Sequence, residues 1–425
     1  MQSHQGVVHK AAPQLFLTFV ALWPLMPRPT VGGPLGTVAP ITLGVFIFCF
    51  FIVWAASPHT GYSAAQPIHA MVLLLTLPLV VYGLRLLIND QFDEVGYWLG
   101  RTEMSLGIFA TFVWLCLSTV DTRQAYRYLL IGYMLLCVPM IYVGVTGQRL
   151  LEEARPTRNY GFYDPFFKAA GVPRSYGELA ILSSAALAYL LVYRHTTRRL
   201  PWVIAMGTFV ISLLVAQSRT GFLAAFVVLA CYLGLRSPAR VTVARVSVLT
   251  AILFPLAVQF VDLSSIKYGP LSGFFSDRTL ELNAQQRISM DSLAISHLLQ
   301  FDLSGIFFGY SRADWLLDIS SLIGRPQVLH NMFLSTLLYF GWVAGSVVLI
   351  AFFLAPIFAI ARRGLHRQAD VCAFLSAVGM IVSLQFYEGF FSLIVMLEIA
   401  VLWYVAYVRH EGPSIVSVQV PDRGV

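Results

Sequence analysis

Long apolar segments recur along almost the whole chain, and this pattern constrains the fold more than any other feature. One of them, from Met332 to Ala361, is almost wholly apolar, and about 20 apolar residues are enough to cross a bilayer as a helix. Of the 425 residues, 58% are hydrophobic and only 12% are charged, whereas soluble domains carry about 25% charged residues. With a mean hydropathy of +0.74, the sequence predicts an integral membrane protein.

The spans are expected to be helices, because the apolar runs are continuous and lack the alternating pattern of an outer-membrane barrel. We expect an all-α polytopic protein with about twelve transmembrane helices in a single domain over residues 1–425. The first apolar run could pass for a signal peptide, but no small-x-small cleavage site follows it cleanly. The expected spans lie near residues 12–27, 38–56, 69–88, 104–120, 127–147, 176–193, 201–217, 220–235, 245–261, 332–361, 370–387 and 390–408.

The charges in the loops predict which way the helices cross. The short loops 193–199, 236–245 and 362–367 are basic, and short positive loops stay in the cytoplasm. Both termini then lie inside, with residues 409–425 as a short cytoplasmic tail. Two longer connections, residues 148–175 and 262–331, are expected outside.

The two outer connections hold ten cations on the face where the positive-inside tendency would thin them out. Loops longer than about 60 residues escape that tendency, which covers the second loop but not the first. Such cations indicate an anionic ligand, although pairing with nearby carboxylates or lipid headgroups is the alternative for most of them. They are Arg149, Arg155, Arg158, Lys168 and Arg174 in the first loop, and Lys267, Arg278, Arg287, Arg312 and Arg325 in the second.

The segment "QSRTGFLA" (217–224) makes a tight break between two spans on the outer side. It holds Ser218 and Arg219, and an arginine at this depth is retained where it faces water, a partner or a ligand. Snorkelling of Arg219 to a lipid phosphate is the alternative.

An amphipathic helix over residues 283–299 is expected in the second outer loop, lying along the membrane surface. Asn283 is its expected N-cap. Arg287 and Asp291 are four residues apart on it, so an intrahelical ion pair is one explanation for Arg287. The expected apolar stripe consists of Ile288, Ile295, Leu298 and Leu299, and His297 is expected to be packed or exposed rather than catalytic.

His330 precedes Asn331 and a long span, so its imidazole is expected at a fixed depth on a rigid helix end. The positive end of the helix dipole favours a neutral imidazole, which is the form that accepts a proton in general base catalysis. The alternative is a histidine that caps the helix or anchors it at the interface.

Other polar residues receive weaker predictions. Glu178 and Glu388 are expected on the outer side, as counter-ions or as groups that orient an arginine or contact sugar hydroxyls. Glu398 within the last span marks either a polar internal contact or a proton path, and the choice between these two roles is left open. The five cysteines are isolated in apolar runs, so neither a disulfide framework nor a metal site is expected.

The segment "QSRTGFLA" and, further along, "GYSRADW" (309–315) and "LHNMFLSTLLYFGWVAG" (329–345) resemble the O-antigen polymerase and O-antigen ligase superfamily. These are bacterial inner-membrane glycosyltransferases with a GT-C-like fold, and the resemblance covers roughly residues 175–360. It makes His330 the candidate base and Arg219 and Arg287 the candidate diphosphate-binding residues, with Arg278 as an alternative to Arg287. Asn331 and Ser218 are candidate orienting or acceptor-binding groups.

The resemblance implies an inverting transfer, without metal or cofactor, from an undecaprenyl diphosphate-linked glycan to an acceptor hydroxyl at the periplasmic face. A polymerase would add repeat units of O-antigen or exopolysaccharide to an acceptor glycan, and a ligase would transfer the glycan to the lipid A core. A membrane transporter or exporter is a third hypothesis. The expected partners are the bilayer and these lipid-linked glycans rather than nucleic acid, and regulation of chain length by a partner is left open.

Overall fold

The chain folds into a bundle of helices, and the residues described contain no strand. The structure is a computed structural model. It describes residues 14, 16–18, 20–22, 65–88, 94–118, 120–146, 176–216, 219–237, 239, 242, 245–247, 278–324, 327–386 and 393–408.

The helices follow the apolar runs of the sequence closely. The expected span near 38–56 lies outside the described residues, and those near 12–27 and 245–261 are described at only a few positions. The helices are α3 (Ala65–Ile88), α4 (Val95–Ser118), α5 (Thr122–Thr146), α7 (Tyr176–Val192), η4 (Arg194–Thr196), α8 (Arg199–Ala216), α9 (Arg219–Leu235), α12 (Arg278–Leu299), α13 (Leu303–Phe308), α14 (Arg312–Ile323), α15 (Met332–Leu349), η6 (Ile350–Leu354), α16 (Ala355–Arg362), α17 (Gln368–Leu384), α18 (Leu393–Trp403) and η8 (Tyr404–Val408).

Two segments of the described helices are long and apolar enough to cross a membrane, His69–Ile88 and Met332–Arg362. The second comprises α15, η6 and α16. Shorter apolar helices accompany them at Ser105–Cys116, Leu179–Val192, Arg199–Leu213, Thr220–Leu235, Gln368–Leu384 and Val395–Val408.

The centre of the larger core is α7, which packs against α5, α9 and α17. All its side chains from Leu179 to Leu190 are buried, as expected for a helix that is apolar on every side. Small residues allow the close approach to α17, since a Cβ at Gly379 would lie 2.5 Å from the side chain of Ser184. The bundle is therefore held by tight contacts between small residues as well as by large apolar side chains.

Two of the basic loops lie at one end of this bundle. Tyr193, which follows α7, lies close to Cys372 near the start of α17, so α7 and α17 run in opposite directions. The loops concerned are 193–199 and 362–367, and the orientation predicted from charge requires them to share a side of the membrane.

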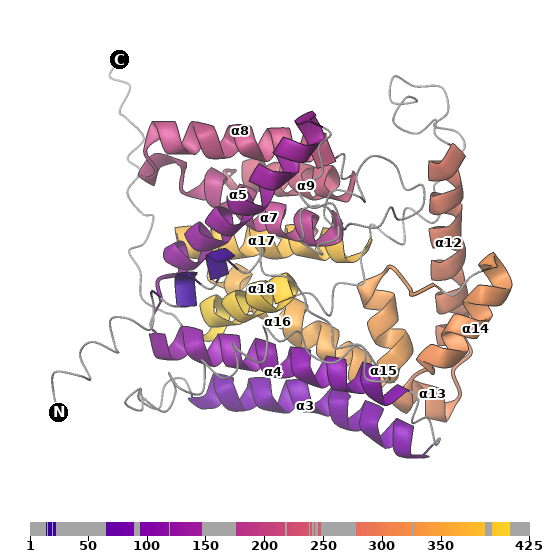
Figure 1. Cartoon of the computed structure of the whole chain (residues 1–425). Coiled ribbons are helices and arrows are strands. Elements are labelled where there is room, and N and C mark those ends of the chain that lie inside the picture. Colours follow the sequence, from indigo (N-terminus) through magenta and orange to yellow (C-terminus); the bar gives the residue numbers. More distant parts are fainter. Residues whose placement is uncertain are drawn as a thin grey trace.

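A second, smaller core joins the end of α3 to α12, α14 and α15. In Figure 1, the axes of α3, α4, α7, α8 and α17 lie nearly parallel across the view, whereas α12 stands across them on the right-hand side. This direction is consistent with the prediction that α12 lies along the membrane surface.

Two details of the predicted α12 are wrong. The helix begins at Arg278, so Asn283 lies inside it and is not its N-cap. Among residues 286–299, whose burial the structure describes, the buried positions are Met290, Ala294 and Leu298, four residues apart, whereas Leu299 is 78% exposed. The buried face is therefore rotated from the predicted stripe, and only Leu298 belongs to both.

Candidate functional site

His330 lies half-buried immediately before α15. The cap of this helix is Asn331, whose side-chain oxygen accepts hydrogen bonds from the N–H groups of Phe333 (3.1 Å) and Leu334 (3.2 Å). His330 is therefore fixed next to a capped helix start and is not itself the cap.

The Gln327 side chain is a polar partner of the imidazole. Its amide nitrogen lies 2.8 Å from His330 Nε2. Which of the two groups donates depends on the tautomer of the ring and on the orientation of the amide. The contact holds the ring in place, and a neutral imidazole has one nitrogen that can take a proton.

Next to His330, the helix α12 approaches the start of α15 through Asp291. Asp291 forms a side-chain hydrogen bond with Asn331 and interacts electrostatically with Arg287 one turn earlier. Burial raises the pKa of the Asp291 carboxyl to about 6, and the Asn331 hydrogen bond and the Arg287 charge act in the opposite direction. The exposed Arg287 thus lies on the α12 turn adjacent to the residue that follows His330.

A cluster of aromatic and acidic side chains holds the far end of α12 against α14. The ring of His297 stacks on Tyr310 at 4.5 Å between centroids, and its Nε2 lies 3.2 Å from Asp318 Oδ2. Tyr310 donates a hydrogen bond of 2.7 Å to the same carboxylate oxygen. His297 is therefore packed, one of the two environments that the sequence left open for it.

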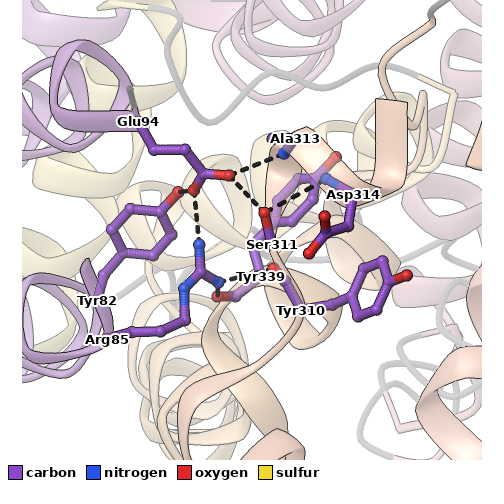
Figure 2. Close-up of polar contacts among 8 residues, drawn as sticks. All are labelled: Tyr82, Arg85, Glu94, Tyr310, Ser311, Ala313, Asp314 and Tyr339. Atoms are coloured by element: carbon purple, nitrogen blue, oxygen red, sulfur yellow. Dashed lines mark hydrogen bonds and ion pairs between the residues drawn. The ribbon is translucent and has the colours of Figure 1, made fainter. Parts of the chain in front are cut away.

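A buried ion pair joins Arg85 of α3 to Glu94, which immediately precedes α4 (Figure 2). The two side chains are 2% and 5% exposed, and Arg85 Nη2 lies 2.6 Å from Glu94 Oε2. Tyr82 also donates to Oε2, while Ser311 Oγ (2.7 Å) and the N–H of Ala313 (2.8 Å) donate to Oε1.

Four donors therefore converge on one carboxylate. Burial alone would raise the pKa of Glu94, but the hydrogen bonds from Tyr82 and Ala313 and the charge of Arg85 lower it below its ordinary value. The charged pair is stable in this position because both oxygens are saturated with donors.

The second terminal nitrogen of Arg85, Nη1, contacts the backbone where helix α15 is interrupted. Arg85 Nη1 donates to the carbonyl oxygens of Tyr310 (2.7 Å) and Tyr339 (3.2 Å). Helix α15 is interrupted at Gly341, where φ is 76° and ψ is 172°. The expected span 332–361 is helical on both sides of this break, but it is not one straight helix.

The sequence did not single out Arg85, Glu94 or Tyr82. A charged residue in an apolar span was the available signal, because Arg85 falls inside the expected span 69–88. The two carbonyls that accept from Arg85 were not predictable in this way, since Tyr310 and Tyr339 belong to segments far along the chain.

The remaining predicted residues are described less completely. Glu178 lies in the first turn of α7, Arg219 begins α9 and Arg278 begins α12. For these three only the helix positions are described, and Ser218 and Glu388 lie outside the described residues.

The starts of α7, α9 and α15 share the end of the bundle opposite the basic loops. Helix α9 runs parallel to α7, because Tyr232 near its end donates to the carbonyl of Leu191 near the end of α7. The segment from α15 to α16 ends in the basic loop 362–367, so it begins at the other end. Arg219 and His330 therefore occupy the same end of the molecule.

The deep carboxylate Glu398 contacts a hydroxyl in the bundle. It is 2% exposed in α18, and Ser376 of α17 donates to its Oε2 at 2.9 Å. A polar internal contact, one of the two roles left open by the sequence, is present. Among the described residues no group of three or more His, Cys, Asp or Glu side chains could hold a metal ion.

This end of the molecule places the imidazole of His330 beside a capped helix start and the exposed guanidinium of Arg287 on the adjacent helix. Neither protein-family models nor curated proteins of known function match the chain by sequence.

Proposed function

We propose that the protein is a polytopic glycosyltransferase of the bacterial inner membrane. It transfers a glycan from an undecaprenyl diphosphate donor to an acceptor hydroxyl at the periplasmic face, with inversion and without a metal ion, and so polymerises O-antigen or exopolysaccharide repeat units. About twelve helices span the membrane, both termini are cytoplasmic, and the loops 148–175 and 262–331 are periplasmic.

The observation that carries this proposal is the meeting of α12 and α15. Asp291 links the Arg287 turn of α12 to Asn331, the residue after His330. A base and a cation on neighbouring helix turns are what a transfer from a diphosphate requires, because a proton leaves the acceptor while negative charge develops on the leaving group.

In the proposed reaction, His330 takes the proton from the acceptor hydroxyl as its oxygen attacks C1 of the donor sugar. The bond from C1 to the diphosphate oxygen breaks, and its electron pair leaves with the undecaprenyl diphosphate. Guanidinium groups bind phosphate oxygens through charge-assisted, often bidentate hydrogen bonds, so Arg287 and Arg219 stabilise that charge. Arg278 is the alternative to Arg287 at the start of the same helix.

Asp291 adjusts the position of Arg287 in this scheme. Its pKa of about 6 leaves it mostly ionised at neutral pH, so it attracts Arg287 toward the start of α15. An anionic donor headgroup competes for the same guanidinium, which is exposed.

A transport function is the second candidate, because transporters often place binding sites at interrupted membrane helices. The break in α15 gives that candidate its only direct support. However, the carbonyls of Leu338 and Tyr339 at this break accept hydrogen bonds from Tyr310 N–H and Arg85, so they are not open to a cargo. We therefore favour glycan transfer.

The test uses purified protein with an undecaprenyl diphosphate-linked glycan, with and without lipid A core. Longer glycans from donor alone identify a polymerase, product formed only with lipid A core identifies a ligase, and no product in either reaction refutes the proposal. His330→Ala is expected to lower kcat by about 10²–10⁴-fold. Arg287→Ala and Arg219→Ala are expected to lower kcat/KM by about 10²–10³-fold.

Matched controls come from the basic loop at the other end of the bundle. His195 and Arg199 are exposed there. His195→Ala and Arg199→Ala should retain wild-type turnover. Equal losses in the test and control variants would mean that the end of the molecule holding His330 has no special role.

A further inference from the structure

The break in α15 leaves backbone groups that another part of the chain must satisfy. A helix interrupted at Gly341 has carbonyls in the preceding turn without their usual N–H partners. The N–H of Tyr310 donates to the carbonyl of Leu338 at 2.6 Å, and Arg85 donates to that of Tyr339. In an apolar setting unpaired carbonyls are costly, so these two donors stabilise the broken form.

Arg85 is itself held from several sides, as Figure 2 shows. Its Nη2 binds Glu94, its Nη1 binds two carbonyls, and the ring of Tyr82 lies 4.3 Å from its central carbon. Glu94 in turn accepts from Ser311, which caps α14, and from Ala313 in the first turn of that helix. The network therefore joins α3, the start of α4, α14 and the break in α15.

The backbone at the break is also tightly confined. Gly309 and Gly341 both have φ of +76°, and a Cβ on Gly309 would lie 2.5 Å from the carbonyl carbon of Tyr339. The turn between α13 and α14, which contains Gly309, is therefore in direct backbone contact with the break in α15. Its Tyr310 carbonyl accepts from the same Nη1 of Arg85 that binds Tyr339.

The first half of α15, from Met332 to Phe340, is a short helical segment that begins next to His330 and ends at the break. Nine residues rise about 13 Å, so a change of about 10° at the break would move the start of the helix by about 2 Å. A misplacement of about 1 Å can lower a reaction rate by about 100-fold.

We propose that Arg85 and Glu94 are positioning residues, which fix the angle of the first half of α15 and thereby place His330 relative to α12. This inference rests on the proposed glycan transfer for its effect on rate. The holding of α15 itself does not depend on that activity.

The test compares Arg85→Gln with Arg363→Gln. Arg363 is a good control because it also pairs with a buried carboxylate, Asp370 at 3.5 Å, and donates to backbone carbonyls, those of Val405 (2.8 Å) and Ala406. It lies in the basic loop, away from the break. Two readouts are needed, which are steady-state kinetics with the lipid-linked donor and hydrogen–deuterium exchange of peptides covering residues 327–341.

Arg85→Gln is expected to lower kcat by about 10–100-fold, with the KM for donor changed by less than about threefold, because the base is displaced while donor contacts remain. Exchange in 327–341 should increase. Arg363→Gln should leave both readouts at wild-type values. Wild-type kcat in Arg85→Gln, or equal losses in both variants, would overturn the proposal.

Glu94→Gln serves as the milder variant if Arg85→Gln cannot be purified. It keeps an acceptor for Ser311 and Ala313 but removes the charge that holds Arg85. A lower kcat with faster exchange in 327–341 supports the proposal, and unchanged values refute it. If the wild-type protein transfers no glycan, the proposed function fails, and the exchange data alone decide whether Arg85 and Glu94 hold α15.

Discussion

Replacing Gly341 with alanine is a direct test of the break in α15. The φ and ψ angles at Gly341, 76° and 172°, fall in a region that is essentially restricted to glycine. A Cβ added there would lie 2.6 Å from the carbonyl oxygen of Ile306, 2.8 Å from that of Gly305 and 2.9 Å from the N–H nitrogen of Gly309. All three are backbone atoms, so no flexible side chain can move aside.

The expected destabilisation has two parts. The backbone conformation costs an L residue about 1–3 kcal/mol, and forcing an extra carbon into a closed site costs a further 1–3 kcal/mol or so. Gly341→Ala should therefore lower the free energy of unfolding by about 2–6 kcal/mol. At about 1–2 °C per kcal/mol for a chain of this length, the midpoint temperature should fall by about 2–12 °C.

The measurement is thermal unfolding of the purified protein in detergent, with Gly207→Ala as the control. A Cβ on Gly207, in α8, would meet nothing within 4 Å. Alanine is favoured over glycine in a helix by about 1 kcal/mol, so the control should be neutral or slightly stabilised. If Gly341→Ala unfolds at or above the wild-type temperature, α15 is continuous and the reasoning about Arg85 loses its basis.

Two further predictions concern the start of α15. Asn331→Ala removes the N-cap that accepts from Phe333 and Leu334, and should lower the free energy of unfolding by about 0.5–2 kcal/mol, whereas Asn331→Ser should retain most of it; equal midpoint temperatures for Asn331→Ala and wild type would contradict this. Asp291 has a folded-state pKa of about 6, above its ordinary 3.8, so the folded protein binds this proton more tightly and the contribution to stability falls as pH rises from about 4 through 6. Asp291→Asn cannot ionise, and its midpoint temperature relative to wild type should be higher at pH 7 than at pH 4.5; a difference that does not vary with pH would show that Asp291 is not the titrating group.

The positions of the helices could be predicted from the sequence because hydropathy is a local property. The expected span 176–193 became Tyr176–Val192, and the expected span 201–217 became Arg199–Ala216. By contrast, the buried face of α12 was predicted incorrectly, since several apolar residues lie on different sides of it. Which side is buried depends on Tyr82, Trp315 and the other residues of the second core, which come from distant segments.

The candidate site was predictable only in part for a similar reason. His330 could be identified from the sequence because it lies at the boundary between a polar and an apolar segment. Asn331 was identified next to it, but the contact of Asn331 with Asp291 depends on the packing of α12 against α15. The break at Gly341 is hidden in a continuous apolar run, where a glycine gives no indication of its φ angle.

A buried arginine and an interrupted helix are each unfavourable in an apolar setting, and here each lowers the cost of the other. In a continuous helix the carbonyl of Tyr339 would not be available to accept from Arg85 Nη1. Without Arg85, the same carbonyl would lose this hydrogen-bond donor. Glu94 completes the arrangement, because a carboxylate with four donors neutralises the guanidinium without needing water. Arg85 in α3 and Gly341 in α15 therefore act together, and they set the direction of the short helix that begins beside His330.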